Sequence, residues 1–280
     1  MATANLLPEL VAKTVLADYN DVEDRLPGTY EIFPQSTINT KYQVFNTITD
    51  ILEPPPLAYF GLGIKGFYNT GDDNQSAPYP PNQDQFDLFQ PIPFRCVPVD
   101  EDLDTATRNK YRMRVRQTFN GQSYWCYYLK CIEPVENSSK IVRIEPVTKQ
   151  EIPYEMSTAQ LTPKPQMPST SGTQDGTITS VVVTKQVRCS WTGSEIYESV
   201  QAMFNGNLLN ARISEYGLYS GVDRVVDGYD ASGNTLRYTE AIYTQLAYKI
   251  CNLGTVVPAA TYDGTRIFTF GNGKLLLQTA

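Results

Sequence analysis

The sequence predicts a strand-dominated α+β protein with antiparallel β-sandwich-like units, an N-terminal helix and two helices in the C-terminal half. Two observations lead to this prediction. The 280 residues include 19 Pro and 18 Gly, which interrupt the chain every few residues, and 19 Tyr. Such a mixture is typical of short strands, many turns and long ordered loops. Apolar residues make up 41% and charged residues 19% of the chain, so one or two domains can bury a core.

Residues 1–56 are expected to form an N-terminal helix and an extended arm. The helix is predicted over residues 5–19, because Asn5 can cap its first turn. Apolar side chains recur there at helical spacing, namely Leu7, Leu10, Val11, Val15 and Leu16. Two roles remain open for this segment: a helix packed in the core, or a terminal arm that docks on a neighbouring subunit.

Consecutive prolines mark the end of this arm. Short extended segments are expected at residues 29–33 and 42–48. The three prolines at 54–56 cannot donate hydrogen bonds to a sheet and favour polyproline II. A strand is therefore expected at 57–62, where it opens a β-rich domain over residues 57–156.

A long ordered loop is expected at residues 68–99 of this domain. The segment holds too many prolines for the interior of a sheet, yet its apolar residues argue against disorder. These residues are Phe86, Leu88, Phe89, Ile92 and Phe94. Long apolar loops that stay ordered need a surface to lie on, and a partner subunit would supply one.

Three antiparallel strands are predicted after the loop, at residues 111–118, 123–131 and 141–146. The dipeptide Asn120-Gly121 separates the first two. Asn and Gly adopt positive φ angles readily, so this pair predicts a hairpin with a type I′ turn.

The first of these strands carries the densest group of basic residues. Arg112, Arg114 and Arg116 alternate with Met113 and Val115, which indicates a strand with one wet face. We expect this arginine face to be solvated or paired at an interface, in preference to lying in a DNA groove.

The second strand contains a run of aromatic residues. Alternation places Trp125 and Tyr127 on one face and the remaining residues, Tyr124, Cys126 and Tyr128, on the other. Aromatic residues on both faces suggest a strand buried once by its own domain and once by a partner. A platform for sugar binding is the alternative.

Residues 157–176 are predicted to be a linker, because four prolines lie in a Ser-, Thr- and Gln-rich background. An α+β domain is expected over 177–280. Its predicted elements are a strand at 177–189, a helix at 193–209, a hairpin at 218–229 and 235–238, a helix at 240–253 stopped by Gly254, and a hairpin at 265–270 and 274–278.

The chain contains no histidine. Histidine is the usual general base near neutral pH and a frequent metal ligand. Ser-His-Asp and Cys-His catalysis and zincin sites are therefore impossible within this chain. No other motif identifies a reaction, so we expect neither catalytic residues nor a cofactor nor a metal.

Three patterns invite chemical roles that the surrounding residues do not support. Residues 61–66 match GxGxxG, but no helix start follows to hold a pyrophosphate, so a bulged strand or tight turn is expected. Acidic clusters, which lack EF-hand spacing, occur at Asp72-Asp73, Asp84/Asp87, Asp100–Asp104 and Asp227/Asp230. Five scattered cysteines predict buried thiols from a reducing compartment, namely Cys96, Cys126, Cys131, Cys189 and Cys251.

The net charge is −7. Nucleic-acid binding needs clustered Lys and Arg, so this balance disfavours a nucleic-acid partner. We also expect no membrane partner, because no apolar run approaches 18 residues, and no signal peptide, because the first residues lack a basic segment followed by an apolar one.

Four segments resemble the neck and baseplate components of tailed bacteriophages, which assemble as rings. They are Ala-Tyr-Phe-Gly-Leu-Gly at 58–63, Ala-Pro-Tyr-Pro at 77–80, Pro-Ile-Pro-Phe-Arg at 91–95 and Tyr-Arg-Met-Arg-Val-Arg at 111–116. The resemblance covers about a quarter of the chain. It implies a non-enzymatic virion protein, made in the cytoplasm of the infected bacterium, that packs against copies of itself in a ring and against other virion proteins.

The sequence thus predicts a structural component of a virion tail, baseplate or neck ring. Its expected interface residues are Phe86, Leu88, Phe89, Ile92, Arg112, Arg114, Arg116, Trp125 and Tyr127. The competing hypothesis is a carbohydrate-binding or glycan-cleaving β-domain that uses Tyr, Trp and paired Asp residues.

Overall fold

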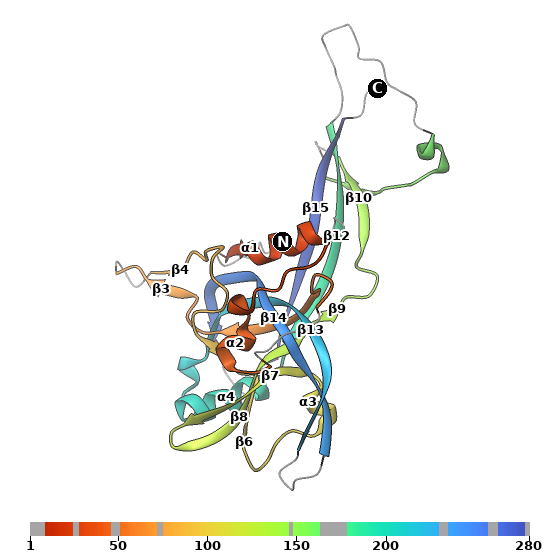
Figure 1. Cartoon of the computed structure of the whole chain (residues 1–280). Helices are drawn as coiled ribbons and strands as arrows, with labels where there is room; N and C mark the ends of the chain where they lie inside the picture. Colours follow the sequence, from red (N-terminus) through yellow and green to blue (C-terminus); the bar gives the residue numbers. More distant parts are fainter. Residues whose placement is uncertain are drawn as a thin grey trace. The chain divides into compact units, whose positions relative to one another are not determined.

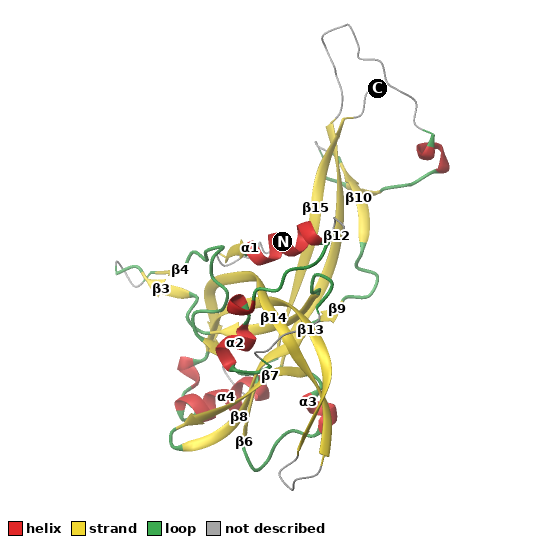
Figure 2. Ribbon diagram, in the orientation of Figure 1, coloured by secondary structure: helices red, strands yellow, loops and turns green. Residues whose placement is uncertain are grey.

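A computed structural model describes residues 9–24, 28–45, 51–71, 75–145, 148–162, 178–229, 235–256 and 263–277 (Figures 1 and 2). Antiparallel strands dominate this part of the chain, which confirms the strand-dominated α+β prediction. The helices in these residues are α1 (Val15–Glu23), α2 (Ile38–Tyr42), α3 (Thr105–Arg108) and α4 (Gly193–Phe204), with short 3-10 turns η1 (Pro34–Ser36), η2 (Thr158–Leu161) and η3 (Leu208–Asn210).

The chain divides into two compact units. Unit 1 comprises Met1–Ile132 and Ser190–Thr265, and unit 2 comprises Glu133–Cys189 and Arg266–Ala280. This division differs from the expected domains at 57–156 and 177–280. Backbone hydrogen bonds explain the difference, because strands from the C-terminal half pair with strands from the N-terminal half in one sheet. Most of the expected linker, residues 163–176, lies outside the described residues.

Unit 1 is built on an antiparallel sheet in the order β1-β14-β13-β2-β8-β6, with β5 beside β2 and β7 beside β8. The bounds of these strands are β1 (Glu9–Lys13), β2 (Leu57–Gly63), β5 (Pro91–Ile92), β6 (Arg95–Pro98), β7 (Tyr111–Phe119), β8 (Gln122–Cys131), β13 (Arg212–Tyr229) and β14 (Thr235–Val256). A separate hairpin joins β3 (Phe67–Asn69) to β4 (Ser76–Pro78). The predicted strand at 57–62 and the strands flanking Asn120-Gly121 are confirmed.

The turn between β7 and β8 has the predicted geometry. Asn120 and Gly121 have φ angles of 51° and 82°, which are the positive values that a type I′ turn requires. The two strands then pair in register from Tyr111 opposite Lys130 to Phe119 opposite Gln122.

The prediction of a helix over 5–19 is wrong for residues 9–13, which form β1 at the edge of β14. The helix begins only at Val15, because the Thr14 hydroxyl accepts a hydrogen bond from the backbone of Ala17 (3.2 Å) and so caps the first turn. Leu10, Val11 and Val15 are exposed, so they form no buried helical stripe. Residues 29–33 form no strand, and α2 and a turn occupy 38–45.

The predicted helix at 240–253 is also wrong, since these residues belong to β14. This strand pairs with β13 along its length and with β1 over residues 248–252. Tyr243, Leu246 and Ile250 are all buried. A strand covered on both faces gives a continuous apolar run, and periodicity alone does not separate such a run from a buried helix.

Strand β8 is buried on both faces, but by its own chain. Tyr128 stacks on Tyr42 of α2 with ring centroids 4.6 Å apart. Tyr127 donates a hydrogen bond to Asp102 at 2.6 Å and is 1% exposed. The expectation that a partner buries the second face is therefore corrected, and this aromatic run is not an exposed sugar platform.

Unit 2 is an antiparallel sheet in the order β11-β10-β12-β15, with β9 beside β12. Its strands are β9 (Glu133–Pro134), β10 (Lys140–Ile144), β11 (Glu151–Pro153), β12 (Ile178–Trp191) and β15 (Gly264–Leu277), the last two of which begin or end in unit 1. The predicted hairpin at 265–270 and 274–278 is wrong, because β15 runs through Gly271-Asn272-Gly273 without a turn. Among the described residues of unit 2, the remaining regular element is η2.

Candidate functional site

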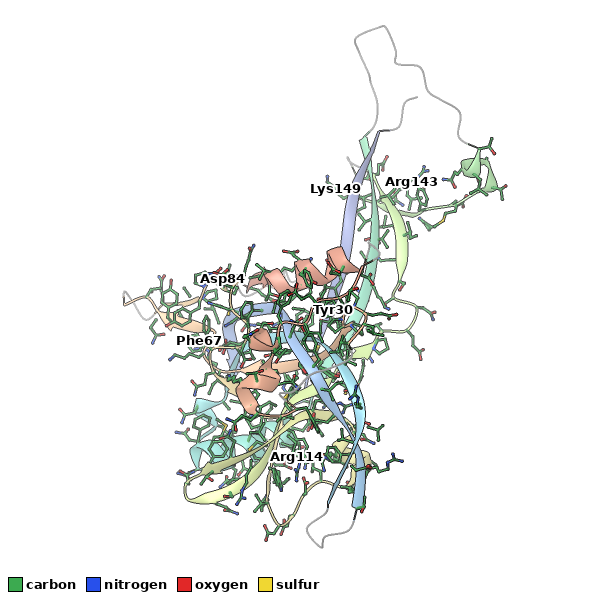
Figure 3. All side chains as sticks on the ribbon, viewed as in Figure 1. Tyr30, Phe67, Asp84, Arg114, Arg143 and Lys149 are labelled. Carbon is green, nitrogen blue, oxygen red and sulfur yellow. The ribbon has the colours of Figure 1, made fainter. Side chains whose placement is uncertain are left out.

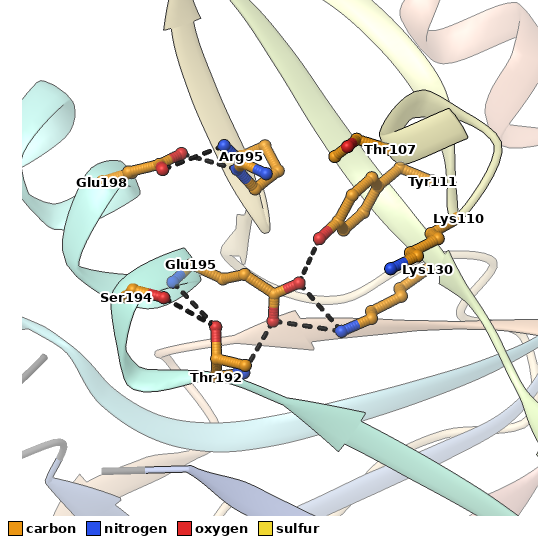
Figure 4. Close-up of a pocket in the computed structure, with 9 residues that line it drawn as sticks. All are labelled: Arg95, Thr107, Lys110, Tyr111, Lys130, Thr192, Ser194, Glu195 and Glu198. Carbon is orange, nitrogen blue, oxygen red and sulfur yellow. Dashed lines mark hydrogen bonds and ion pairs between the residues drawn. The ribbon is translucent and has the colours of Figure 1, made fainter. Parts of the chain in front are cut away.

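Unit 1 contains a polar pocket of about 310 Å³. Figure 4 shows that its walls come from the start of α4, from β6, from the segment that runs from α3 into β7, and from the end of β8. The lining residues are Arg95, Thr107, Lys110, Tyr111, Lys130, Thr192, Ser194, Glu195 and Glu198.

The sequence at the start of α4 places two carboxylates in this pocket. Thr192 and Glu195 form a capping box, in which the Thr192 hydroxyl accepts from the Glu195 backbone (3.2 Å) and the Glu195 carboxylate accepts from the Thr192 backbone (2.6 Å). Glu198 follows three residues later and therefore lies on the same side of the helix. The pattern Thr-Gly-Ser-Glu thus begins the helix and orients its first acidic residue.

Glu195 is the centre of the hydrogen bonds in the pocket. It is buried, and its carboxylate accepts from Lys130 Nζ at 2.8 and 3.1 Å and from the Tyr111 hydroxyl. Burial and the bond to Glu195 raise the pKa of Tyr111, so this phenol remains protonated at neutral pH. These bonds fasten α4 to β7 and β8.

A second ion pair lies beside the first. Arg95 of β6 donates two hydrogen bonds to Glu198, at 2.6 and 3.0 Å, in the bidentate geometry that makes such pairs strong. The two glutamates therefore neutralise Arg95 and Lys130. Lys110 has no side-chain hydrogen bond or ion pair in the described part of the chain, and it leaves the pocket with one unpaired positive charge.

The pocket can accept a small acidic group at Lys110, and its hydroxyl groups are held in hydrogen bonds. The Thr107 hydroxyl donates to Asp104 at 2.6 Å, and the Ser194 and Thr192 hydroxyls lie 2.9 Å apart. The Thr107 hydroxyl is thus bonded to a carboxylate, and the Ser194 and Thr192 hydroxyls are bonded to each other. Within the described residues, no group of three or more His, Cys, Asp or Glu side chains could hold a metal ion.

A second surface feature of unit 1 is an aromatic patch formed by Tyr68, Tyr79 and Phe89. The ring centroids are 4.9 Å apart for Tyr68 and Tyr79 and 5.6 Å apart for Tyr79 and Phe89. Tyr68 and Phe89 are exposed. Tyr79, Phe89 and the exposed Lys65 line an apolar cavity of about 220 Å³ beside these rings, so the patch presents aromatic surface to solvent.

The structure buries four of the nine predicted interface residues within the chain itself. Leu88, Ile92, Arg112 and Tyr127 are each 5% exposed or less. Their assignment to an interface is corrected, because a buried side chain cannot contact a partner. The segment 68–99 therefore packs in part on its own core.

The arginines of β7 do not share one wet face. Arg112 is buried and donates two hydrogen bonds of 2.7 Å to Asp223. Arg114, labelled in Figure 3, lies 3.3 Å from the centroid of the Trp125 ring and donates to Asp102. Only Arg116 of the three is exposed.

Five predicted interface residues thus reach the surface of unit 1 in part or in full: Phe86, Phe89, Arg114, Arg116 and Trp125. None of the five lines the polar pocket. Phe89 alone belongs to the aromatic patch.

The other sequence motifs have structural roles. Residues 61–66 continue β2 into a bend followed by β3, with no helix, as expected. Asp87 accepts a hydrogen bond from Tyr219 (2.8 Å) and pairs with Lys41. Asp84, labelled in Figure 3, lies on the exposed loop before it. Asp72, Asp73 and Asp230 lie outside the described residues.

Sequence reasoning missed a buried ion pair at the centre of unit 1. Glu215 of β13 and Lys249 of β14 are both 0% exposed, and their charged atoms lie 3.7 Å apart. The sequence predicts a helix at 240–253, and a helix gives no reason to place Lys249 beside Glu215. The capping-box pattern at Thr192–Glu195, by contrast, is a local signal that could have identified Glu195.

The thiols are free, as the sequence indicates. Cys96, Cys126, Cys189 and Cys251 are buried, and Cys131 is partly buried. No helix in the described residues has the length and apolar character needed to cross a membrane.

Comparison with known proteins gives one positive finding. No curated protein and no solved structure matches the chain. The model of a family of unknown function, DUF7208, matches residues 1–278. The match spans nearly the whole sequence, and the chain therefore belongs to the DUF7208 family.

Proposed function

We propose that this chain is a structural component of a bacteriophage virion, in a tail, baseplate or neck ring, and that it acts through protein–protein assembly without catalysis. It packs against copies of itself and against other virion proteins. The observation that supports this most strongly is the exposed apolar surface of the unit 2 sheet.

The unit 2 sheet exposes apolar side chains on three of its strands. Ile152 of β11 and Val183 of β12 are 47% and 49% exposed and lie on the same face, because Arg143 of β10 is opposite both Ile152 and Val181. Ile267 of β15 is 51% exposed and lies on the other face, because Thr265 and Thr269 on either side of it contact Ser190 and Gln186 of β12. A β-sheet needs a second layer to bury its apolar face. The described residues of unit 2 supply no such layer, because they contain only this sheet and η2. A partner surface would complete the packing.

The edges of the same sheet offer further pairing sites. β11 and β15 are its outer strands, so each presents one row of backbone groups without a ladder partner among the described strands. Edge strands of this kind pair readily with another chain. A ring of copies would use these groups without requiring a catalytic site.

The aromatic patch of unit 1 supports the same proposal. Exposed aromatic side chains are enriched at protein interfaces, and Phe89 was an expected interface residue. Lys65 beside the patch adds a positive charge without a side-chain partner in the described residues, which suits an acidic group on the docking protein.

Size-exclusion chromatography with light scattering tests the assembly over a range of concentrations. The wild-type chain is expected at a multiple of the subunit mass. Val183→Glu should shift it toward the monomer, because an interface would have to bury an unpaired carboxylate. The matched control is Val225→Glu, since Val225 is a valine of similar exposure (58%) on β13 of unit 1.

The outcomes of this experiment are distinct. A control that assembles like the wild type, together with a monomeric Val183→Glu variant, supports the proposal. A wild-type chain that remains monomeric at every concentration contradicts a ring of copies, and equal assembly of all three proteins contradicts the use of the unit 2 sheet.

The aromatic patch also supports the competing function, a carbohydrate-binding domain. Sugars stack on exposed aromatic rings, and a small cavity lies beside Tyr79 and Phe89. Binding of bacterial surface glycans by the wild type, abolished in Tyr79→Ala and retained in Val183→Glu, would favour this alternative over assembly.

A further inference from the structure

Two cysteines lie directly opposite each other in the core of unit 1. Cys96 of β6 and Cys126 of β8 are an in-register antiparallel pair, so their side chains point to the same face of the sheet. Their sulfur atoms are 3.3 Å apart, and neither cysteine is in a disulfide. This separation is contact distance between two thiols.

The backbone geometry around this pair permits a covalent bond. Residues directly opposite on antiparallel strands have Cα atoms about 4.5 or 5.5 Å apart. Both values fall in the range of about 4.4–6.8 Å in which disulfides form. The sulfur atoms need to approach each other by only about 1.3 Å to reach a bond length near 2.05 Å, so the two strands can remain in register.

The position of β6 also provides access for a small oxidant. β6 lies at the edge of the sheet and pairs only with β8 among the described strands. Edge strands open locally at a lower free energy than central strands. Cys96 is 6% exposed, and a brief separation of β6 would expose it further.

We infer that Cys96 and Cys126 are a two-electron oxidation site at which the fold directs formation of an intrachain disulfide. The oxidant is a small peroxide such as hydrogen peroxide. It first converts one thiol to a sulfenic acid with release of one water. The second thiol attacks the sulfenic sulfur, the S–S bond forms, and a second water leaves. The two cysteines together lose two electrons and two protons, and the peroxide is reduced to water.

The reduced pair is stable until an oxidant is present. The hydrogen bond with Cys96, together with burial, raises the pKa of Cys126, so this thiol stays protonated at neutral pH. Once formed, the bond would hold β6 on β8. Arg95, the residue before Cys96, pairs with Glu198, so the same bond would strengthen the attachment of α4 to the sheet.

Peptide mapping of the native protein tests this inference. The reduced chain is treated with hydrogen peroxide, alkylated under denaturing conditions and digested without reductant. The alkylatable thiols are expected to fall from five to three, the intact mass to decrease by about 2 Da as two hydrogens are lost, and one linked peptide to join Cys96 to Cys126. Cys131→Ser should form the same link.

Two controls separate the effect of the fold from general thiol reactivity. Cys96→Ser should yield no linked peptide that contains Cys126. The wild-type chain oxidised in concentrated urea should give a mixture of links, because the unfolded chain does not hold these residues together. If the serine variant does not fold, the comparison of native with unfolded wild type decides alone.

Three results would overturn the inference. The first is retention of all five thiols in native protein under conditions that fully oxidise dithiothreitol. The second is a link between other cysteines as the main native product. The third is the same single link in native and in unfolded protein. None of these results bears on assembly through the unit 2 sheet.

Discussion

Replacing Glu215 by glutamine should destabilise the chain more than replacing Lys249 by methionine. Both side chains are fully buried, but their remaining partners differ. Glu215 accepts hydrogen bonds from the backbone N–H groups of Phe89 (2.7 Å), Gln90 (3.1 Å) and Lys65 (3.2 Å). A glutamate without Lys249 would therefore keep three donors.

The lysine has fewer partners to retain. Lys249 donates to the backbone carbonyl of Asp87 at 3.0 Å and lies 3.2 Å from the centroid of the Phe89 ring. In Glu215→Gln it would remain as a buried charge without its ion-pair partner. Breaking a buried pair in this way costs about 3–5 kcal/mol. Lys249→Met should cost less, about 1–3 kcal/mol, because hydrogen bonds to the remaining carboxylate partly offset its burial.

Urea unfolding of the two single variants and the double variant measures these differences. The double variant should be more stable than the sum of the single effects predicts, because it leaves no isolated charge. Three results would contradict this prediction: equal losses of stability in the two single variants, a larger loss in Lys249→Met, or strict additivity in the double variant.

The same pair has a predicted pH dependence. Burial lowers the pKa of Lys249 below its ordinary value of 10.5. Between the lowered native pKa and 10.5 the unfolded chain binds more protons than the folded chain, so this residue makes stability rise with pH. Across that interval the stability difference between wild type and Lys249→Met should shift in favour of the wild type as the pH rises.

Three further predictions concern single features of unit 1. Thr192→Ala should lower the free energy of unfolding, measured in urea, by about 1 kcal/mol because the cap of α4 is lost. The control Ser194→Ala, at the same helix end, should lower that free energy by less than half as much. Gly121→Ala should lower the thermal midpoint, because an alanine at a φ of 82° is strained by about 1 kcal/mol; an unchanged midpoint would argue against the turn geometry. Burial opposes ionisation of Asp223, but hydrogen bonds from Arg112 outweigh this effect and lower the pKa of Asp223. The stability that the carboxylate contributes is therefore fully present above its ordinary pKa of 3.8. It is lost as the pH falls through the lower pKa of the folded state. The stability advantage of wild type over Asp223→Asn should therefore disappear in acid, and an advantage that grows in acid would contradict this.

Local sequence signals predicted the elements that depend on local physics. The Asn120-Gly121 turn and the strands that flank it follow from backbone preferences at two positions. The helix predicted at 193–209 follows from an apolar face at helical spacing, and the structure ends it at Phe204. These features need no information about distant parts of the chain.

The errors arose where distant strands decide the structure. Residues 240–253 form a strand because β13 and β1 pair with them, and no local signal reports that pairing. In residues 264–277, Gly271 and Gly273 favour a turn, yet the segment runs as one strand in the sheet with β12. In both cases inter-strand hydrogen bonds override local propensity.

The candidate interface was predictable only in part. Alternation on β7 indicated a wet arginine face, but Arg112 is buried against Asp223, which lies on β13. Leu88 and Ile92 are apolar residues in a proline-rich loop, and sequence alone does not show whether such residues pack on their own core or on a partner. The exposed residues of the unit 2 sheet were missed because an apolar alternation looks the same whether or not a second layer covers it.

The most direct test of a structural role in the virion is whether the chain is part of assembled phage particles. Particles are purified by density-gradient centrifugation from cultures that produce this chain and are washed in high salt, and its peptides are quantified by mass spectrometry against those of the major capsid protein. The proposed function predicts that the chain remains with the particles in a fixed ratio after washing, and that Val183→Glu is depleted from them while Val225→Glu is retained. Recovery of the wild-type chain only in the soluble fraction would contradict a structural role in the virion.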